Sequence, residues 1–254
     1  MKFHVLSIAL TLLIGTLSFG QNSNIDHFKT NKGNLTIQPI LHGSAVLTYK
    51  QKTIYVDPYG GSKLYKGLDA PDIILITDIH GDHLHQSTLD SLDISNAIFI
   101  VPQEVAKKLP ETYKSKIIIL NNGQAIHRFN FFIKAIPMYN LPETEDSRHP
   151  KGRGNGYVID IDSEKRVYFS GDTEDIDEMR MLQNIDIAFI CMNLPFTMSI
   201  DQAASAVLEF QPKIVYPYHY RGTEGLSDIE AFKKLITSEN KQIEVRLKNW
   251  YPKD

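Results

Sequence analysis

Short apolar runs separated by polar, turn-forming residues dominate the chain after residue 34. Runs of this kind, rich in Val, Ile, Leu and Phe, are typical of buried or half-buried strands. Strands are expected at Leu35–Leu41, Ala45–Tyr49, Thr53–Val56, Ile73–Ile76, Ile117–Leu120, Ile126–Phe129, Phe131–Ile136, Gly156–Ile161, Val167–Ser170, Ile185–Cys191, Ile214–Pro217 and Ile243–Leu247. Helices are expected at Ser87–Leu92, Gln103–Leu109, Ile176–Leu182, Ser199–Glu209 and Ile229–Thr237. The order of elements is a block of strands, a helical zone, a second block of strands and then alternating strands and helices. This order predicts an α/β sandwich of sheets with helices outside.

The first twenty residues have the pattern of a secretory signal peptide. Lys2 precedes an apolar run from Val5 to Phe19, and Ser18 and Gly20 are small residues at the −3 and −1 positions of a cleavage site after Gly20. A membrane anchor is the alternative, but the apolar run is short and no basic stop-transfer cluster follows it. We therefore expect an exported protein, periplasmic or secreted, with no stable membrane anchor after cleavage.

The remaining chain is expected to hold one domain. Residues 21–34 are polar and are expected to be flexible, and residues 35–254 have a length typical of a single domain. Hydrophobic residues make up 42% of the sequence, enough for a sizeable core. The formal net charge is −3 and there is no basic stripe, which argues against a nucleic-acid partner. The one cysteine, Cys191, lies in an apolar run and is expected to be buried. The oligomeric state stays open.

The most informative stretch is Thr77-Asp-Ile-His-Gly-Asp-His-Leu-His85, directly after the strand expected at Ile73–Ile76. Asp78, His80, Asp82 and His83 crowd into the turn beyond the strand end. A strand end holds the backbone in place, and the loop lets several side chains converge on one point. Imidazole and carboxylate groups arranged in this way are typical ligands of a divalent cation. A solvated polar turn is the alternative interpretation.

Three further candidates follow strand-like runs or lie in loops far along the chain. Asp172 follows Gly171, whose freedom of backbone conformation could direct a carboxylate outward from a strand end. His219 follows the apolar run that ends at Pro217, and His149 lies in the long polar loop from residue 140 to residue 155. Each of these signals is weak by itself.

Together these pieces resemble the metallo-β-lactamase-fold hydrolase superfamily. The resemblance covers roughly Leu35 to Leu247 and rests on Tyr55-Val56-Asp57-Pro58, the Asp78–His83 loop, Gly171-Asp172-Thr173 and Pro217-Tyr218-His219. Within the superfamily, the chain is similar to the branch of metal-dependent hydrolases that includes the ascorbate-6-phosphate lactonase type. The resemblance implies a four-layer αββα sandwich with a metal site at one edge of the two sheets.

The resemblance also implies a set of ligands for two divalent metal ions. The first ion would be held by Asp78, His80 and His149, the second by Asp82, His83 and His219, and Asp172 would bridge them. The sequence departs from the superfamily pattern twice: Asp78 replaces the usual first histidine, and the middle histidine is absent from the strand exit at Pro137–Asn140, which leaves His149 as its substitute. Zinc is the expected metal. Asp78 adds a third carboxylate to those of Asp82 and Asp172. A carboxylate is a harder ligand than an imidazole, which could favour manganese or iron.

The implied chemistry is hydrolysis of a small ester, lactone or phosphodiester by water that the metals activate, with Asp82 orienting the nucleophile and passing its proton on. Asp57 is expected to orient metal ligands. His42, His85 and Tyr139 are candidates for supporting or substrate contacts, as are Arg153 and Tyr220. Two alternatives stay open, a β-lactamase-type hydrolase and a non-catalytic metal- or ligand-binding member of the fold.

Overall fold

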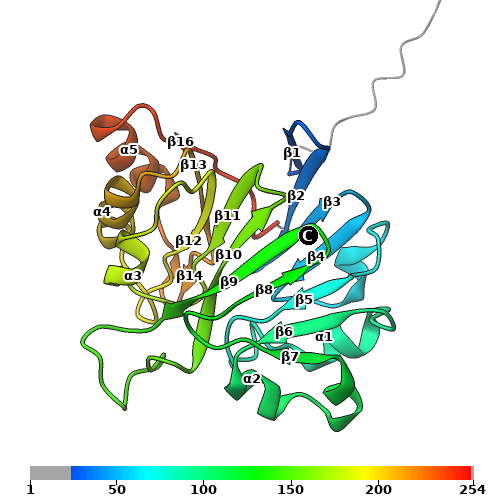
Figure 1. The fold of residues 1–254 in the computed structure, drawn as a ribbon. Helices are drawn as coiled ribbons and strands as arrows, with labels where there is room; N and C mark the ends of the chain where they lie inside the picture. Colours follow the sequence, from blue (N-terminus) through cyan, green and yellow to red (C-terminus); the bar gives the residue numbers. More distant parts are fainter. Residues whose placement is uncertain (1–23, 253–254) are drawn as a thin grey trace, which may run out of the picture.

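Two seven-stranded β-sheets face each other, and helices cover their outer faces (Figure 1). The computed structural model describes residues 24–252. The predicted signal peptide therefore lies outside the described residues. No helix in the described part of the chain is long and apolar enough to cross a membrane. The αββα sandwich expected from the sequence is confirmed.

The first sheet holds seven strands in sequence order. They are β1 (Asp26–Lys29), β2 (Asn34–Leu41), β3 (Ser44–Tyr49), β4 (Lys52–Val56), β5 (Ile73–Leu75), β6 (Ile98–Val101) and β7 (Ile117–Ile119). Strands β1 to β4 pair antiparallel, and β4 to β7 pair parallel. The parallel strands all end at the same edge, which places the loops that follow β4 and β5 side by side.

The second sheet has the order β16-β13-β12-β11-β10-β9-β8. Its strands are β8 (Ala125–Arg128), β9 (Phe131–Met138), β10 (Gly154–Ile161), β11 (Lys165–Phe169), β12 (Ile187–Cys191), β13 (Ile214–Tyr218) and β16 (Glu244–Val245). Strands β11, β12 and β13 are parallel, so their carboxyl ends also share one edge. The loops after β11 and β13 carry two of the predicted site residues to that edge.

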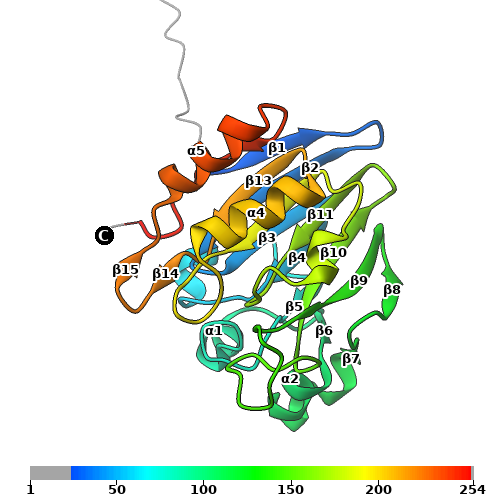
Figure 2. The ribbon, with the colours of Figure 1, turned by 90° about the vertical axis from the view of Figure 1, so that its left-hand side faces the viewer.

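Helices pack on the two outer faces (Figure 2). The buried hydrophobic residues form two clusters, on opposite faces of the first sheet. The helices are α1 (Gln86–Ser91), α2 (Gln103–Lys108), α3 (Asp177–Arg180), α4 (Ile200–Phe210) and α5 (Ile229–Glu239), with 3-10 turns η1 (Ser62–Tyr65) and η2 (Glu111–Lys116). On β5, Ile73 and Leu75 enter the large core between the sheets, whereas Ile74 enters the smaller core under α1 and α2. This alternation is the two-residue period of a strand that is covered on both faces.

Three parts of the fold correct the sequence-based expectation. The segment 21–34 was expected to be flexible, but its residues Asp26–Lys29 form β1, paired with β2 from Asp26↔Ile37 to Lys29↔Asn34. Phe28 is buried in the large core, and that burial secures a strand whose other residues are polar. The small hairpin of β14 (Arg221–Gly222) and β15 (Gly225–Leu226) was also missed, because two-residue strands carry no periodic signal. The four-residue strand β6 (Ile98–Val101) was not predicted either.

Candidate metal centre

Six predicted side chains meet at the shared edge of the two sheets. His80, Asp82 and His83 follow β5, Asp172 follows β11, and His219 follows β13. His149 reaches the same point from the loop between β9 and β10. That loop folds back far enough to leave the His149 side chain 0% exposed. The structure therefore brings together residues that lie far apart in sequence, as the strand-end argument predicts.

The carboxylate of Asp172 lies at the middle of this cluster. Its oxygens are 3.3 Å from His83 Nε2, 3.4 Å from His149 Nε2 and 3.5 Å from His219 Nε2. His219 Nε2 also lies 3.4 Å from Asp82 Oδ2. All three histidine nitrogens and Asp172 Oδ1 are buried without a hydrogen-bond partner in the described structure.

These distances match a metal site better than a hydrogen-bonded one. Hydrogen bonds between nitrogen and oxygen are commonly about 2.9–3.0 Å long. Metal bonds of about 2.0–2.1 Å in tetrahedral arrangement instead place two ligand atoms about 3.3–3.4 Å apart. Burying a histidine nitrogen without a hydrogen-bond partner costs free energy, unless a cation binds to it. His83, Asp172 and His219 thus fit a divalent cation. Ligand atoms of Asp78, His80 and His149 form a second group within 4.8 Å of one another.

Each of the two most buried histidines is oriented by a neighbour. His83 Nδ1 lies 2.8 Å from Asp57 Oδ2 and 2.9 Å from Thr77 Oγ1, which leaves Nε2 pointing at Asp172. Asp57 is itself held by the Thr77 backbone N–H and hydroxyl. His149 Nδ1 lies 3.1 Å from the Asn140 side-chain oxygen, which also accepts from the His149 backbone N–H. The orienting role predicted for Asp57 agrees with this geometry.

The backbone around the cluster is held in conformations that few residues adopt. His42, Asp57 and His219 have φ angles of 59°, 42° and 46°, in the left-handed region. Strain of this type is found at sites where the surrounding fold over-determines the backbone. Gly171 (φ 63°) makes the turn that presents Asp172, and a Cβ there would lie 2.6 Å from Met138 Sδ. A side chain at position 171 would therefore clash, which explains why a glycine precedes Asp172 in the sequence.

Asp78 has a partner that the sequence did not reveal. Arg153 donates from Nε to Asp78 Oδ1 at 3.1 Å and from Nη2 to Oδ2 at 3.0 Å, a bidentate pair. His80 Nδ1 lies 2.6 Å from Asp78 Oδ2, closer than two ligands of one metal normally stand. The negative charge that Asp78 adds to the site is thus offset by Arg153. Whether Asp78 also binds a metal stays a prediction.

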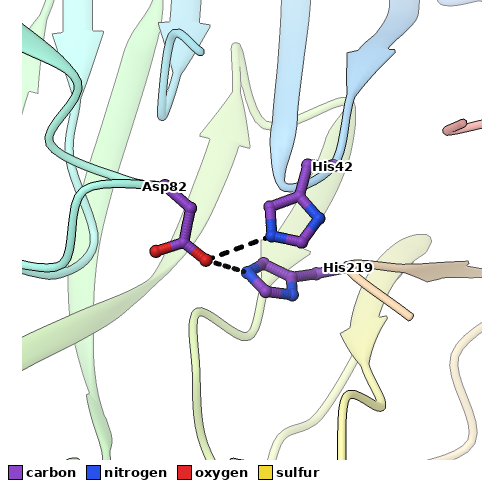
Figure 3. A group of neighbouring side chains, drawn as sticks. All are labelled: His42, Asp82 and His219. Atoms are coloured by element: carbon purple, nitrogen blue, oxygen red, sulfur yellow. Dashed lines mark hydrogen bonds and ion pairs between the residues drawn. The ribbon is translucent and has the colours of Figure 1, made fainter. Parts of the chain in front are cut away.

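Asp82 is contacted by two histidines from different parts of the fold. His42 Nε2 lies 3.1 Å and His219 Nε2 lies 3.4 Å from the same oxygen, Oδ2 (Figure 3). His42 Nδ1 lies 2.6 Å from the hydroxyl of Tyr251, near the end of the described chain. His42 therefore belongs to the site, as a support for Asp82 or as an additional donor to a cation.

Electrostatics within the cluster favour ionised carboxylates beside cationic groups. Burial alone would raise the pKa of Asp172, but the imidazoles of His219 and His83 outweigh it and hold that pKa well below its usual range. Burial likewise opposes protonation of His83, yet Asp172 and Asp57 raise the pKa of this histidine well above its usual value. The same negative field that attracts protons here would attract a divalent cation.

Two candidates lie outside the cluster. His85 Nδ1 is 2.6 Å from the Thr88 hydroxyl at the start of α1, and its ring packs on Tyr59. The Tyr139 hydroxyl donates to Glu178 and accepts from Lys151, which also lies over the ring. Both therefore have structural partners. Sequence reasoning missed the orienting roles of Thr77 and Asn140, although each lies two residues beyond the end of a strand, which was the available signal.

Comparison with known proteins agrees with this geometry. Residues 28–220 match the family described as the β-lactamase superfamily domain. The chain belongs to this family. A candidate metal-dependent hydrolase of known structure from Parabacteroides distasonis is 40% identical, with a TM-score of 0.79 over 89% of this chain and 99% of that one. The UPF0173 metal-dependent hydrolase of Pyrococcus horikoshii is 31% identical over 65% of this chain and 74% of its own length.

More distant relatives share the fold. Igni18, a metallo hydrolase from Ignicoccus hospitalis, is 24% identical with a TM-score of 0.71 over 84% of this chain and 94% of that chain. The family match and the likeness to the Parabacteroides distasonis structure confirm the metallo-β-lactamase fold predicted from the sequence. The protein is a metal-dependent hydrolase of the metallo-β-lactamase superfamily.

Proposed function

We propose that this hydrolase uses two divalent cations, zinc or the harder manganese or iron, to cleave a small ester, lactone or phosphodiester. The observation that carries the proposal is the set of three unpartnered histidine nitrogens around the Asp172 carboxylate. When bound, the cations would activate a water molecule and stabilise the negative charge that develops on the substrate.

The chain's own residues have separable tasks in this proposal. Asp172 would lie between the two sites, with His83 and His219 on one side and His149 on the other. Asp82 keeps one oxygen, Oδ1, out of the contacts with His42 and His219, and its side chain is 35% exposed. It can therefore accept a proton from the attacking water and pass it to the leaving group.

The test is an activity screen of the metal-loaded protein over lactones, esters, phosphodiesters and β-lactams. We expect turnover of one of the first three classes, lost on chelation and restored by zinc or manganese, with about two metal equivalents bound. Preferred turnover of β-lactams would instead support the β-lactamase alternative. Bound metal with no turnover in any class would support a non-catalytic member of the fold.

We also propose that the protein acts outside the cytoplasm after cleavage behind Gly20. The support is the basic start, apolar run and small-residue exit of residues 1–20. Mass spectrometry of the protein isolated from its native host should find Gln21 as the first residue. Recovery of the intact N-terminus from the cytoplasmic fraction would contradict this.

A further inference from the structure

A small cavity lies beside the metal centre, and an arginine forms part of its lining. Its volume is about 290 Å³, and it is lined by Leu41, His42, Tyr59, Asp82, Arg221 and Tyr251. His42 and Asp82 are the groups that contact each other at the edge of the cluster (Figure 3). Small-molecule sites usually measure ~300–1,000 Å³, so this cavity suits a small substrate.

The arginine is held in place but has no acidic partner. Its guanidinium carbon lies 4.3 Å from the centre of the Tyr251 ring. The Arg221 backbone N–H donates to the Tyr251 hydroxyl at 3.1 Å, and that hydroxyl contacts His42. Within residues 24–252, no carboxylate lies within 4.0 Å of the Arg221 guanidinium; by contrast, Arg153 and Arg180 both pair with acids.

The acid nearest in sequence does not serve Arg221 either. Glu224 lies in the turn of the β14–β15 hairpin and lines a separate cavity with Leu194 and Pro195. An arginine that is stacked on an aromatic ring and free of acids keeps its planar set of N–H donors for a ligand. Because its side chain is already positioned, less conformational entropy is lost when a ligand binds.

We infer that Arg221 binds a carboxylate group of the substrate, while the bond to be hydrolysed lies over the metal centre. This inference rests on the proposed function for the identity of the reacting bond. Among the described lining residues Arg221 is the only fixed cation, and one guanidinium neutralises one carboxylate through two parallel hydrogen bonds. A dianionic phosphate would keep an uncompensated charge near Asp82.

The other walls restrict the body of the substrate. Tyr59 and Tyr251 present aromatic surface and Leu41 presents aliphatic surface, which favours a flat, largely apolar body. Asp82 at the inner wall repels an anion, whereas Arg221 attracts one. The substrate is thereby oriented with its carboxylate away from the catalytic carboxylates.

The test measures binding and turnover separately on the metal-loaded protein. Calorimetry measures the binding of benzoate, phenyl phosphate and benzyl alcohol. The proteins compared are the wild type, Arg221→Gln, Arg221→Lys and the control Arg128→Gln. Arg128 is an exposed residue on β8 that lines none of these cavities. Turnover is measured with 4-acetoxybenzoate and with neutral phenyl acetate.

We expect Arg221→Gln to weaken benzoate binding about tenfold or more, with benzyl alcohol unchanged. The KM for 4-acetoxybenzoate should rise by a similar factor at nearly constant kcat, because the contact is equal in ground and transition states. The benzoate affinity of Arg221→Lys should lie between those of the wild type and Arg221→Gln, and Arg128→Gln should bind benzoate as the wild type does.

Equal benzoate binding by the wild type and Arg221→Gln would overturn the inference. So would tighter binding of phenyl phosphate than of benzoate. Failure of the proposed function is a different result: benzoate binding depends on Arg221, but neither ester is hydrolysed. Unchanged thermal melting of Arg221→Gln would show that any lost binding reflects the missing guanidinium.

Discussion

The paired charges of Asp78 and Arg153 allow a prediction that separates their roles. The Asp78 side chain is 0% exposed and that of Arg153 is 16% exposed, so water screens the pair weakly. Breaking a buried ion pair by removing one partner costs ~3–5 kcal/mol, because the other charge is left buried. Water can reach part of the Arg153 position, and we therefore expect Arg153→Met to cost about 2–3 kcal/mol. For a domain of this size, that corresponds to a fall in Tm of about 4–12 °C.

A double-mutant cycle makes the argument specific. Asp78→His alone leaves the Arg153 guanidinium without its acid beside a metal centre, and Arg153→Met alone leaves the Asp78 carboxylate with only the imidazoles of His80 and His149 nearby. The double variant Asp78→His/Arg153→Met removes both charges. We expect it to be more stable than either single variant, and to bind zinc more tightly than Asp78→His alone.

The assays are thermal melting of the chelator-treated protein and zinc affinity by competition with a chelating dye. Arg128→Met serves as the control, since Arg128 is exposed and, among the described residues, its guanidinium hydrogen-bonds only to the carbonyl of His127. Additive effects of the two substitutions, within about 0.5 kcal/mol, would refute the idea that the two residues act as one unit.

Three further predictions address the metal ligands and the core. His149→Ala should lower the bound metal by about one equivalent in elemental analysis, and unchanged metal content would assign the position to other groups. Asp172 and Asp57 raise the pKa of His83 and so favour a proton on its ring, which a bound cation should displace; metal affinity should therefore increase with pH. Calorimetry in buffers of different ionisation enthalpy should detect the released proton. A heat of metal binding that does not depend on the buffer would contradict this prediction. Burial raises the pKa of Cys191 to about 12, so the thiol should react with Ellman's reagent only after unfolding; rapid reaction of the native protein would show that this strand opens.

Local pattern was sufficient for most of the fold. Apart from β6, strands β2 to β13 and the five helices lie within a few residues of their expected positions, because alternating or continuous apolar runs report burial directly. The loop after β5 was also readable, since four of its side chains lie within six residues of one another. Turn chemistry identified Gly171 for the same local reason.

Contacts between distant segments were decided only by the tertiary structure. Arg153 and Asp78 are separated by 75 positions, and the contact between His42 and Tyr251 spans 209. No periodicity in a single segment encodes which partner a charged or aromatic side chain will meet across two sheets. The charge balance of the metal centre and the arginine cavity beside it therefore follow from how the strand ends converge, because that convergence selects which side chains share a low-dielectric space.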